Sequence, residues 1–304
     1  MSSAEYLQQA NQLMSVLQFQ NAEKLYQKVL ETEPKSIDAR VGLGRLALIR
    51  HQTDQGVQLL EEALRLQPNH AEALALKGVS RMQAEDWKSA VELLNQARNA
   101  DPNLQMTYYN LAHSYRKLGN LQEAETAVKK AIALNDKDFQ SHAELSYIYG
   151  QSKKVKEGIE EMLKAIEINP YFLKGYLVLA ALYRTAAKHD LAIELYRQAL
   201  GKVPAALMVY EELSDTHVAK GDYKAAYMDA VTLVTKRNDF RDYLRLGSYA
   251  LALKDPSRAE KAFQNAQALK YDPVAGGEFL KKILASDNNL LNEADTLRKA
   301  VEAR

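Results

Sequence analysis

The chain has 304 residues, with 40 basic and 39 acidic side chains, a formal net charge of +1 and no cysteine. The near-neutral charge argues against a nucleic-acid binder, which usually carries a clear basic excess to neutralise phosphates. The missing cysteines exclude disulfides, thiolate nucleophiles and zinc sites built on thiolates. A hydrophobic share of 47% that leans on Ala and Leu favours a folded, helical chain.

The N-terminal stretch MSSAEYLQQANQLM contains neither a basic segment nor an apolar core, so we do not expect it to be a secretory signal. No stretch of the sequence approaches the run of about 18 apolar residues that a membrane-spanning helix needs. The sequence therefore predicts a cytoplasmic protein without membrane insertion.

A short pattern then returns along the chain at a fixed distance, as KVLETEPKSIDA (28–39), EALRLQPNHAEA (62–73) and QARNADPNLQMT (96–107). The prolines within it stand 34 residues apart at Pro34, Pro68 and Pro102, and again at Pro170 and Pro204. Asp136 occupies the position between the two groups. Self-similarity at one period indicates a repeat architecture.

Aligned on this proline, the repeats begin near residues 3, 37, 71, 105, 139, 173, 207 and 240, and the last ends at about Pro273. Three positions of the repeat hold mostly small side chains. Position 8 is Ala10, Gly44, Gly78, Ala112, Ser146, Ala180, Ser214 and Gly247; position 20 is Ala22, Gly56, Ala90, Ala124, Gly158, Ala192, Ala226 and Ala259; position 27 is Val29, Ala63, Ala97, Ala131, Ala165, Ala199, Leu233 and Ala266. Two antiparallel helices approach closely only where both side chains are small, so each repeat is predicted to be a pair of amphipathic helices.

The 34-residue period, the small residues at positions 8, 20 and 27, and the proline at position 32 resemble the tetratricopeptide repeat (TPR). The resemblance covers residues 3–273. It implies an all-α fold, a right-handed superhelical α-solenoid of about eight helix-turn-helix units.

Residues 274–304 do not follow the repeat pattern. GGEFLKKILAS (276–286) predicts a short helix. DNNLLNEADTLRKAVEAR (287–304) predicts a longer one whose apolar residues share one face, namely Leu290, Leu291, Ala294, Leu297 and Val301. A stacked array leaves its last apolar face open to water, so we expect these to be C-terminal capping helices. A docking helix for a partner is the alternative.

No motif for catalysis, metal binding or cofactor binding emerges from the sequence. None of the six histidines has a second histidine three or four residues away, and two imidazoles such as His113 and His142 fall short of a zinc site. The glycines occupy close-packing positions or turns, and none forms a phosphate-binding loop. We therefore expect no enzyme activity, no metal and no cofactor.

In proteins with this repeat, positions 2, 5, 9 and 12 of the first helix line the concave groove of the superhelix. The resemblance thus places twelve groove candidates: Met82, Met106, Tyr109, His113, Arg116, Tyr147, Lys174, Arg184, Met208, Glu211, Asp215 and Arg241. Tyr and Arg often carry interface energy, and Met adapts to irregular apolar surfaces. Basic repeats 4–6 facing an acidic repeat 7 would orient an extended ligand. Packing within the stack is the alternative role for Tyr109 and Tyr147.

Some relatives with this repeat hold the acidic tails of chaperones in a carboxylate clamp. The clamp uses Lys and Asn at positions 5 and 9 of one first helix, Asn at position 6 of the next, and Lys and Arg at positions 2 and 6 of the third. Here the first pair is Ala75 and Val79, the last is Gln140 and Glu144, and Asn110 alone matches. We therefore expect no such clamp.

The resemblance implies a non-catalytic scaffold or adaptor that binds a partner protein or peptide in the concave groove. The alternatives are a TPR subunit or fragment of a larger enzyme such as a glycosyltransferase, an RNA-binding helical repeat, and a self-assembling structural scaffold. Of these, the near-neutral charge disfavours nucleic acid as a partner. Self-association through the terminal repeats is a further expectation.

Overall fold

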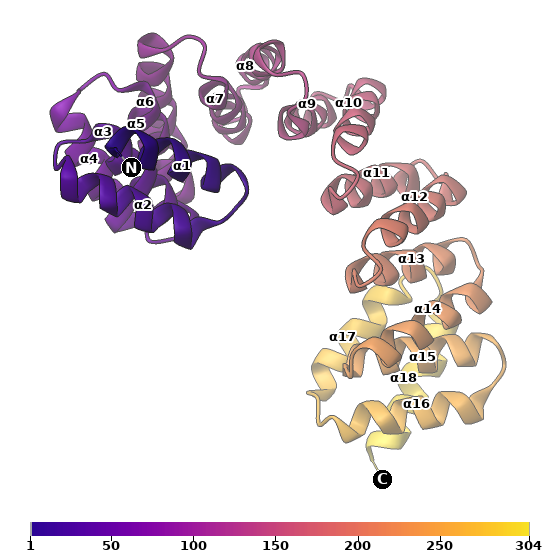
Figure 1. Cartoon of the computed structure of the whole chain (residues 1–304). Coiled ribbons are helices and arrows are strands. Elements are labelled where there is room, and N and C mark those ends of the chain that lie inside the picture. Colours follow the sequence, from indigo (N-terminus) through magenta and orange to yellow (C-terminus); the bar gives the residue numbers. More distant parts are fainter. Residues whose placement is uncertain (1, 304) are drawn as a thin grey trace. The chain divides into compact units, whose positions relative to one another are not determined.

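The computed structural model describes residues 2–303, which form 18 helices joined by short turns (Figure 1). Consecutive helices pack as antiparallel pairs, so the predicted all-α solenoid of paired helices is confirmed. The described residues contain nine such pairs, eight in the repeated region and a ninth that follows it. The chain divides after Ile168 into two compact units, called the N-terminal unit and the C-terminal unit below.

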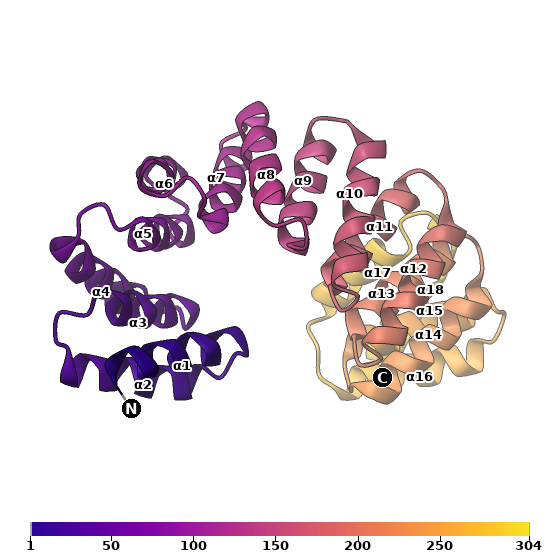
Figure 2. The same ribbon diagram turned by 45° about the horizontal axis from the view of Figure 1, so that its top comes forward.

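The N-terminal unit consists of five helix pairs that follow one another in chain order (Figure 2). Its helices are α1 (Ser3–Ser15), α2 (Phe19–Thr32), α3 (Ile37–Ile49), α4 (Thr53–Leu66), α5 (Ala71–Gln83), α6 (Trp87–Ala100), α7 (Gln105–Lys117), α8 (Leu121–Leu134), α9 (Phe139–Gln151) and α10 (Val155–Ile168). Each helix packs on the next one in the chain.

The C-terminal unit consists of four helix pairs. Its helices are α11 (Leu173–Thr185), α12 (His189–Lys202), α13 (Leu207–Ala219), α14 (Tyr223–Lys236), α15 (Phe240–Ala252), α16 (Pro256–Ala268), α17 (Pro273–Ile283) and α18 (Asn288–Glu302).

The turn between the two helices of a repeat contains one residue in a left-handed backbone conformation in all eight repeats. Its residue at position 15 has a positive φ in each, namely Leu17, His51, Glu85, Gly119, Lys153, Ala187, Gly221 and Lys254. Only Gly119 and Gly221 adopt this left-handed conformation without a steric cost from Cβ. The turn is therefore imposed by the packing of the helices it joins, since six side chains accept the strain.

The helices of each pair meet at the small residues that the sequence places at positions 8, 20 and 27. Every residue at these positions is buried. In the second repeat a Cβ on Gly44 would lie only 3.4 Å from the carbonyl oxygen of Gly56. In the fifth repeat the Ser146 hydroxyl donates a hydrogen bond of 2.6 Å to the carbonyl of Gly158. The small residues at positions 8 and 20 thus set the spacing within each pair.

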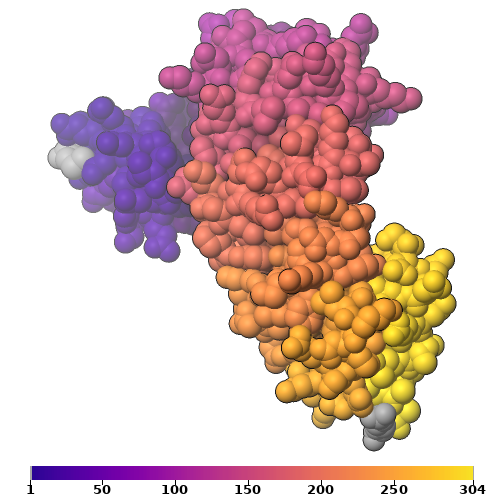
Figure 3. All heavy atoms as spheres, turned by 90° about the vertical axis from the view of Figure 1, so that its right-hand side faces the viewer, coloured from indigo at the N-terminus to yellow at the C-terminus, as the bar shows by residue number. Residues whose placement is uncertain are grey.

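The ninth pair, α17 and α18, packs on the last repeat in a different way from the pairs before it. Helix α18 lies against both α15 and α16, while α17 lies against α15, so the yellow C-terminal pair covers one side of these helices in Figure 3. Leu290, Ala294 and Val301 on α18 are buried in the same core as Phe263. The sequence predicted these three on one apolar face. It did not predict that Arg298 would be buried beside them.

We predict that Gly247→Ala destabilises the C-terminal unit. A methyl group there would lie 2.5 Å from ring carbon Cε1 of Phe263, whose side chain is 1% exposed and has no room to move. Overpacking of this kind lowers the free energy of unfolding by about 1–3 kcal/mol. The measurement is urea denaturation followed by far-UV circular dichroism. In the control Gly201→Ala, on α12, the new methyl group meets no atom within 4 Å. That variant should be neutral or gain up to about 1 kcal/mol, and equal losses in both variants would contradict the packing argument.

Candidate functional site

The first helices of neighbouring repeats approach one another in the N-terminal unit. Contacts join α1 to α3, α3 to α5, α5 to α7 and α7 to α9, whereas the second helices of neighbouring repeats lie farther apart. This unit therefore curves toward its first helices. We call the surface formed by positions 2, 5, 9 and 12 of the odd-numbered helices the first-helix face; it carries the twelve groove candidates.

Helices α7 and α9 are joined by an ion pair on this face. The Arg116 guanidinium donates from Nε to Glu144 Oε1 at 2.5 Å and from Nη2 to Glu144 Oε2 at 3.2 Å. His113 Nδ1 lies 3.2 Å from the same Oε2. Glu144 is only 3% exposed and Arg116 12% exposed, so the pair is largely shielded from water. Two candidates, His113 and Arg116, are thus fixed by a carboxylate that was not among the candidates.

The environment of Glu144 keeps it ionised. Burial raises the pKa of this carboxyl, but the hydrogen bonds from His113 and Arg116 outweigh burial, and the net pKa lies below its usual value of 4.5. The neighbouring phenol of Tyr109 shifts the other way. Burial and then the negative charge of Glu144 raise the pKa of Tyr109 to about 12, so it stays protonated at neutral pH.

Aromatic rings surround this ion pair. The guanidinium carbon of Arg116 lies 5.4 Å from the ring centroid of Tyr147 on α9, a cation–π contact. The ring of Trp87, at the start of α6, lies 5.8 Å from that of His113 at an angle of 51°. Tyr109, His113, Arg116, Glu144 and Tyr147, called the α7/α9 cluster below, therefore form one connected group on the first-helix face.

The other two candidates of the N-terminal unit are methionines. Met82 on α5 and Met106 on α7 are partly buried and pack against the core cluster that contains Leu111 and Leu145. They therefore contribute to packing between repeats as well as to the face.

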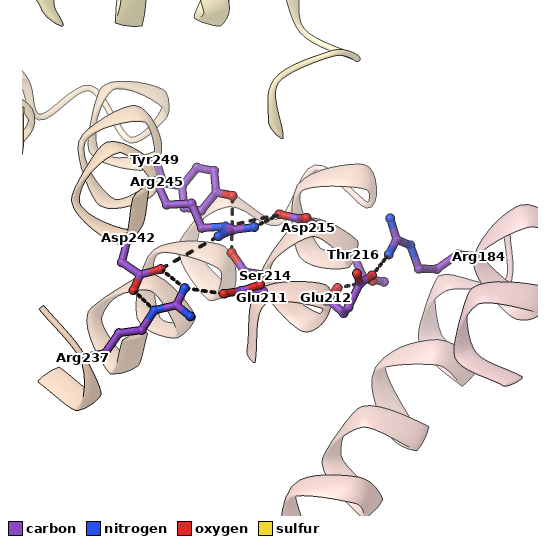
Figure 4. Close-up of polar contacts among 10 residues, drawn as sticks. All are labelled: Arg184, Glu211, Glu212, Ser214, Asp215, Thr216, Arg237, Asp242, Arg245 and Tyr249. Carbon is purple, nitrogen blue, oxygen red and sulfur yellow. Dashed lines mark hydrogen bonds and ion pairs between the residues drawn. The ribbon is translucent and has the colours of Figure 1, made fainter. Parts of the chain in front are cut away.

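In the C-terminal unit, three candidates take part in ion pairs within the chain (Figure 4). Arg184 on α11 pairs with Glu212 on α13. Asp215 on α13 accepts hydrogen bonds of 3.0 and 3.3 Å from Nη2 and Nε of Arg245 on α15, and Arg245 is 5% exposed. Glu211 pairs with Arg237. The acidic repeat 7 is therefore largely neutralised, by Arg184 and Arg245 from the neighbouring repeats and by Arg237 at its own C-terminal end.

Arg237 lies in the turn before α15 and is held by two carboxylates. Its Nε donates to Asp242 Oδ2 at 2.6 Å and its Nη2 to Asp242 Oδ1 at 3.0 Å, while Nη2 also contacts Glu211. Asp242 is fully buried. The hydrogen bonds to Asp242, and then those to Glu211, raise the pKa of Arg237 above its usual value despite burial. This bidentate geometry fixes the plane of the guanidinium.

Three candidates of this unit remain accessible. Lys174 near the start of α11 and Arg241 on α15 are exposed, and Met208 on α13 is 52% exposed. The guanidinium carbon of Arg241 lies 5.2 Å from the ring centroid of the preceding residue, Phe240.

Sequence mapping missed four residues that shape the face, because they lie at positions outside the four mapped: Glu144, Arg237, Asp242 and Arg245. One signal in the sequence could have found Glu144. Arg at position 12 of a first helix is followed 28 residues later by Glu at position 6 of the next in both Arg116–Glu144 and Arg184–Glu212. Adjacent first helices bring these two positions together, so the same pair forms in both units.

Among residues 2–303, no group of three or more His, Asp or Glu side chains is arranged to hold a metal ion. His113 and His142 contact different carboxylates, Glu144 and Glu161.

A pocket of about 670 Å³ between α6, α7 and α8 is lined by none of the groove candidates. No helix within the described part of the chain is long and apolar enough to cross a bilayer.

Family models agree with the repeat pattern. Two models of the tetratricopeptide repeat match residues 17–79 in one case and residues 109–171 and 177–238 in the other, and together they cover more than half of the chain. A model described as anaphase-promoting complex, cyclosome, subunit 3 matches residues 49–131.

Individual relatives are distant. The Homo sapiens protein O-mannosyl-transferase TMTC1 is 25% identical over 198 residues, which is 64% of this chain and 22% of the relative. Hsp70-Hsp90 organizing protein 2 of Arabidopsis thaliana is 26% identical over 162 residues, 53% of this chain and 27% of the relative. The chain thus spans less than a third of either relative. Among solved structures, Pseudomonas aeruginosa pilF shares the fold with a TM-score of 0.53 at 18% identity, covering 86% of this chain and 96% of that one.

We predict that Glu144→Gln lowers the free energy of unfolding by roughly 3 kcal/mol, because it leaves Arg116 charged, shielded from water and without its ionic partner. The measurement is urea denaturation at neutral pH. The matched control is Glu31→Gln, which breaks a pair with Lys28 in which both side chains are more than half exposed. Its loss should stay below about 1 kcal/mol. Equal small losses would show that the Arg116–Glu144 pair carries little stability.

Stability should also fall in acid. Since the pKa of Glu144 is lower in the folded protein than its usual 4.5, the unfolded chain takes up the proton first as the pH falls. The stabilising contribution is present above pH 4.5 and is lost as the pH falls through the lowered pKa. Glu161 is shifted in the same direction, because hydrogen bonds from Lys164 and His142 outweigh its burial. Urea midpoints measured between neutral pH and about pH 3 should decline less in Glu144→Gln than in the wild type; parallel declines would contradict the assignment.

Proposed function

This chain belongs to the tetratricopeptide repeat family, and from that premise we propose that it is a non-catalytic scaffold or adaptor. It binds a segment of a partner protein on the first-helix face. Domains of this family typically mediate protein–protein interactions, and stacked helical repeats bind ligands on their concave surface.

The α7/α9 cluster is the observation that carries this proposal. It brings partly buried tyrosine, histidine and arginine side chains together on the first-helix face, and the buried Glu144 and the ring of Tyr147 hold the arginine in place. Side chains that are already ordered lose less conformational entropy when a partner binds. Tyrosine and arginine are also the residues that most often dominate interface energies.

The buried histidines support a structural role rather than a catalytic one. His142 contacts Glu161 at 2.6 Å, and His217 contacts Asp229 at 2.7 Å. Each pair joins the first helix of a repeat to its own second helix, and both imidazoles are at most 8% exposed. These contacts tie helix pairs together inside the core.

A second candidate function is the repeat portion of a longer protein. TMTC1 and the Hordeum vulgare protein SPINDLY, named as a probable N-acetylglucosaminyltransferase, align with this chain over only 22% and 18% of their own lengths. In that case the first-helix face would bind a substrate or subunit for activity located elsewhere. Sequencing the full transcript distinguishes the two: an open reading frame that continues into a catalytic domain favours the second candidate.

We predict that Met208→Glu abolishes partner binding while Met228→Glu preserves it. Met208 lies on the first-helix face of α13 and is 52% exposed; Met228 lies on the second helix α14 and is 59% exposed. The two substitutions thus place the same charge on equally accessible sites. Tagged variants are compared with wild type by affinity capture from native lysate and mass spectrometry, after circular dichroism confirms equal helix content.

The expected result is a set of proteins retained by the wild type and Met228→Glu and lost from Met208→Glu. Retention of the same set by all three would contradict binding on this face. Reversal of Arg116 is a poorer test, because it would place a second carboxylate beside buried Glu144 and unfold the unit.

A further inference from the structure

We propose that a pocket between α13, α15 and α17 binds a carboxylate group of an acidic segment in the partner protein. This inference rests on the proposed function and names one site within it. The pocket is lined by Glu211, Arg237, Arg241, Arg245, Phe279 and Lys282, called the α17 pocket below.

The α17 pocket lies on the first-helix face of the C-terminal unit. Its volume is about 330 Å³, enough for one or two side chains of an extended peptide. Glu211 comes from α13 and the two arginines 241 and 245 from α15, so the pocket includes two of the groove candidates. Figure 4 shows Glu211, Arg237 and Arg245 close together on this side of α13 and α15.

Four cationic side chains converge on the pocket, and two of them are already held in place. Arg237 is fixed by Asp242 and Glu211, and Arg245 by Asp215. The guanidinium carbon of Arg245 also lies 5.2 Å from the ring centroid of Phe279 on α17. These two arginines therefore need no rearrangement to present their charge to a ligand.

The other two cations have no counter-charge. Neither Arg241 nor Lys282 forms an ion pair with any residue between 2 and 303, and both are exposed at the edge of the pocket. The four cations of the pocket and the three carboxylates that pair with them leave one excess positive charge. One negative charge from a ligand would balance it. This count favours a carboxylate over a doubly charged phosphate.

Phe279, the apolar residue of the pocket, favours a peptide over a free anion as the ligand. Phe279 offers an apolar surface beside the charged groups, which suits the aliphatic part of a glutamate side chain or its neighbour in a peptide. A small anion would gain only the attraction of the charges, without this apolar contact.

Helix α17 completes this site, so the C-terminal pair does more than cover the end of the stack. Phe279 and Lys282 come from α17, whose Leu280 and Ile283 are buried in the core of the last repeat. The Arg298 Nη1 group of α18 donates to the carbonyl of Pro273 at the first residue of α17, at 3.1 Å. On this proposal, α17 and α18 would act both as capping helices and as part of a docking site, the two alternatives for residues 274–304.

The test uses fluorescence anisotropy with the full chain and a fluorescein-labelled hexapeptide of alternating Glu and Leu. The comparison peptide replaces each Glu with Gln. We expect saturable binding of the Glu peptide, weaker binding as salt is raised, and at least about tenfold weaker binding of the Gln peptide. Arg241→Glu and Lys282→Glu should each weaken binding of the Glu peptide by about tenfold, since attraction becomes repulsion.

Lys281→Glu is the matched control. It makes the same change of charge on the neighbouring residue of α17, which is also exposed and does not line the pocket. It should leave the affinity for the Glu peptide within about twofold of wild type. Circular dichroism and thermal midpoints establish that all three variants are folded.

Four outcomes would overturn the proposal: no binding of the Glu peptide, equal binding of the Gln peptide, equal weakening by Lys281→Glu and Lys282→Glu, or tighter binding of a phosphoserine version. None of these outcomes would contradict the proposed scaffold function. That function is tested separately by the capture experiment with Met208→Glu and Met228→Glu.

Discussion

Close approach of the two helices within each repeat is the constraint on which the rest of the structure depends. Small residues at positions 8, 20 and 27 let the helix backbones approach, as where Gly44 faces Gly56 and where Ser146 bonds to the carbonyl of Gly158. Large side chains such as Leu94 fill the remaining core. The polar positions of the first helices are then left to form a surface of their own.

Charged residues on that surface are organised mainly by neighbouring repeats. Arg116 and Arg184 each reach a glutamate on the next first helix, 28 residues further along the chain. Arg245 reaches back to Asp215 in the same manner. These ion pairs hold the side chains of the face in place and neutralise many of its charges. Arg241 and Lys282 differ from these residues, because both line the α17 pocket and neither forms an ion pair among the described residues.

The C-terminal pair illustrates how a terminal element can serve two purposes. Its apolar residues are buried in the same core as those of the last repeat. Because α17 lies against α15 rather than continuing the repeat, it also brings Phe279 and Lys282 onto the first-helix face. A regular ninth repeat would have offered a different helix surface there.

The sequence by itself determined the helix pairs, because the 34-residue period and the small side chains at fixed positions leave one way to pack: Gly44, Ala112 and Ala180 all lie at buried crossings. It also placed the residues that could line the first-helix face. Only the tertiary structure decided which of them are held in ion pairs within the chain, since the partners of Arg116 and Asp215 lie about 30 residues away on another helix. The burial of Arg298 and the α17 pocket likewise depend on how α17 and α18 cross the last repeat, a packing choice that the repeat period does not encode.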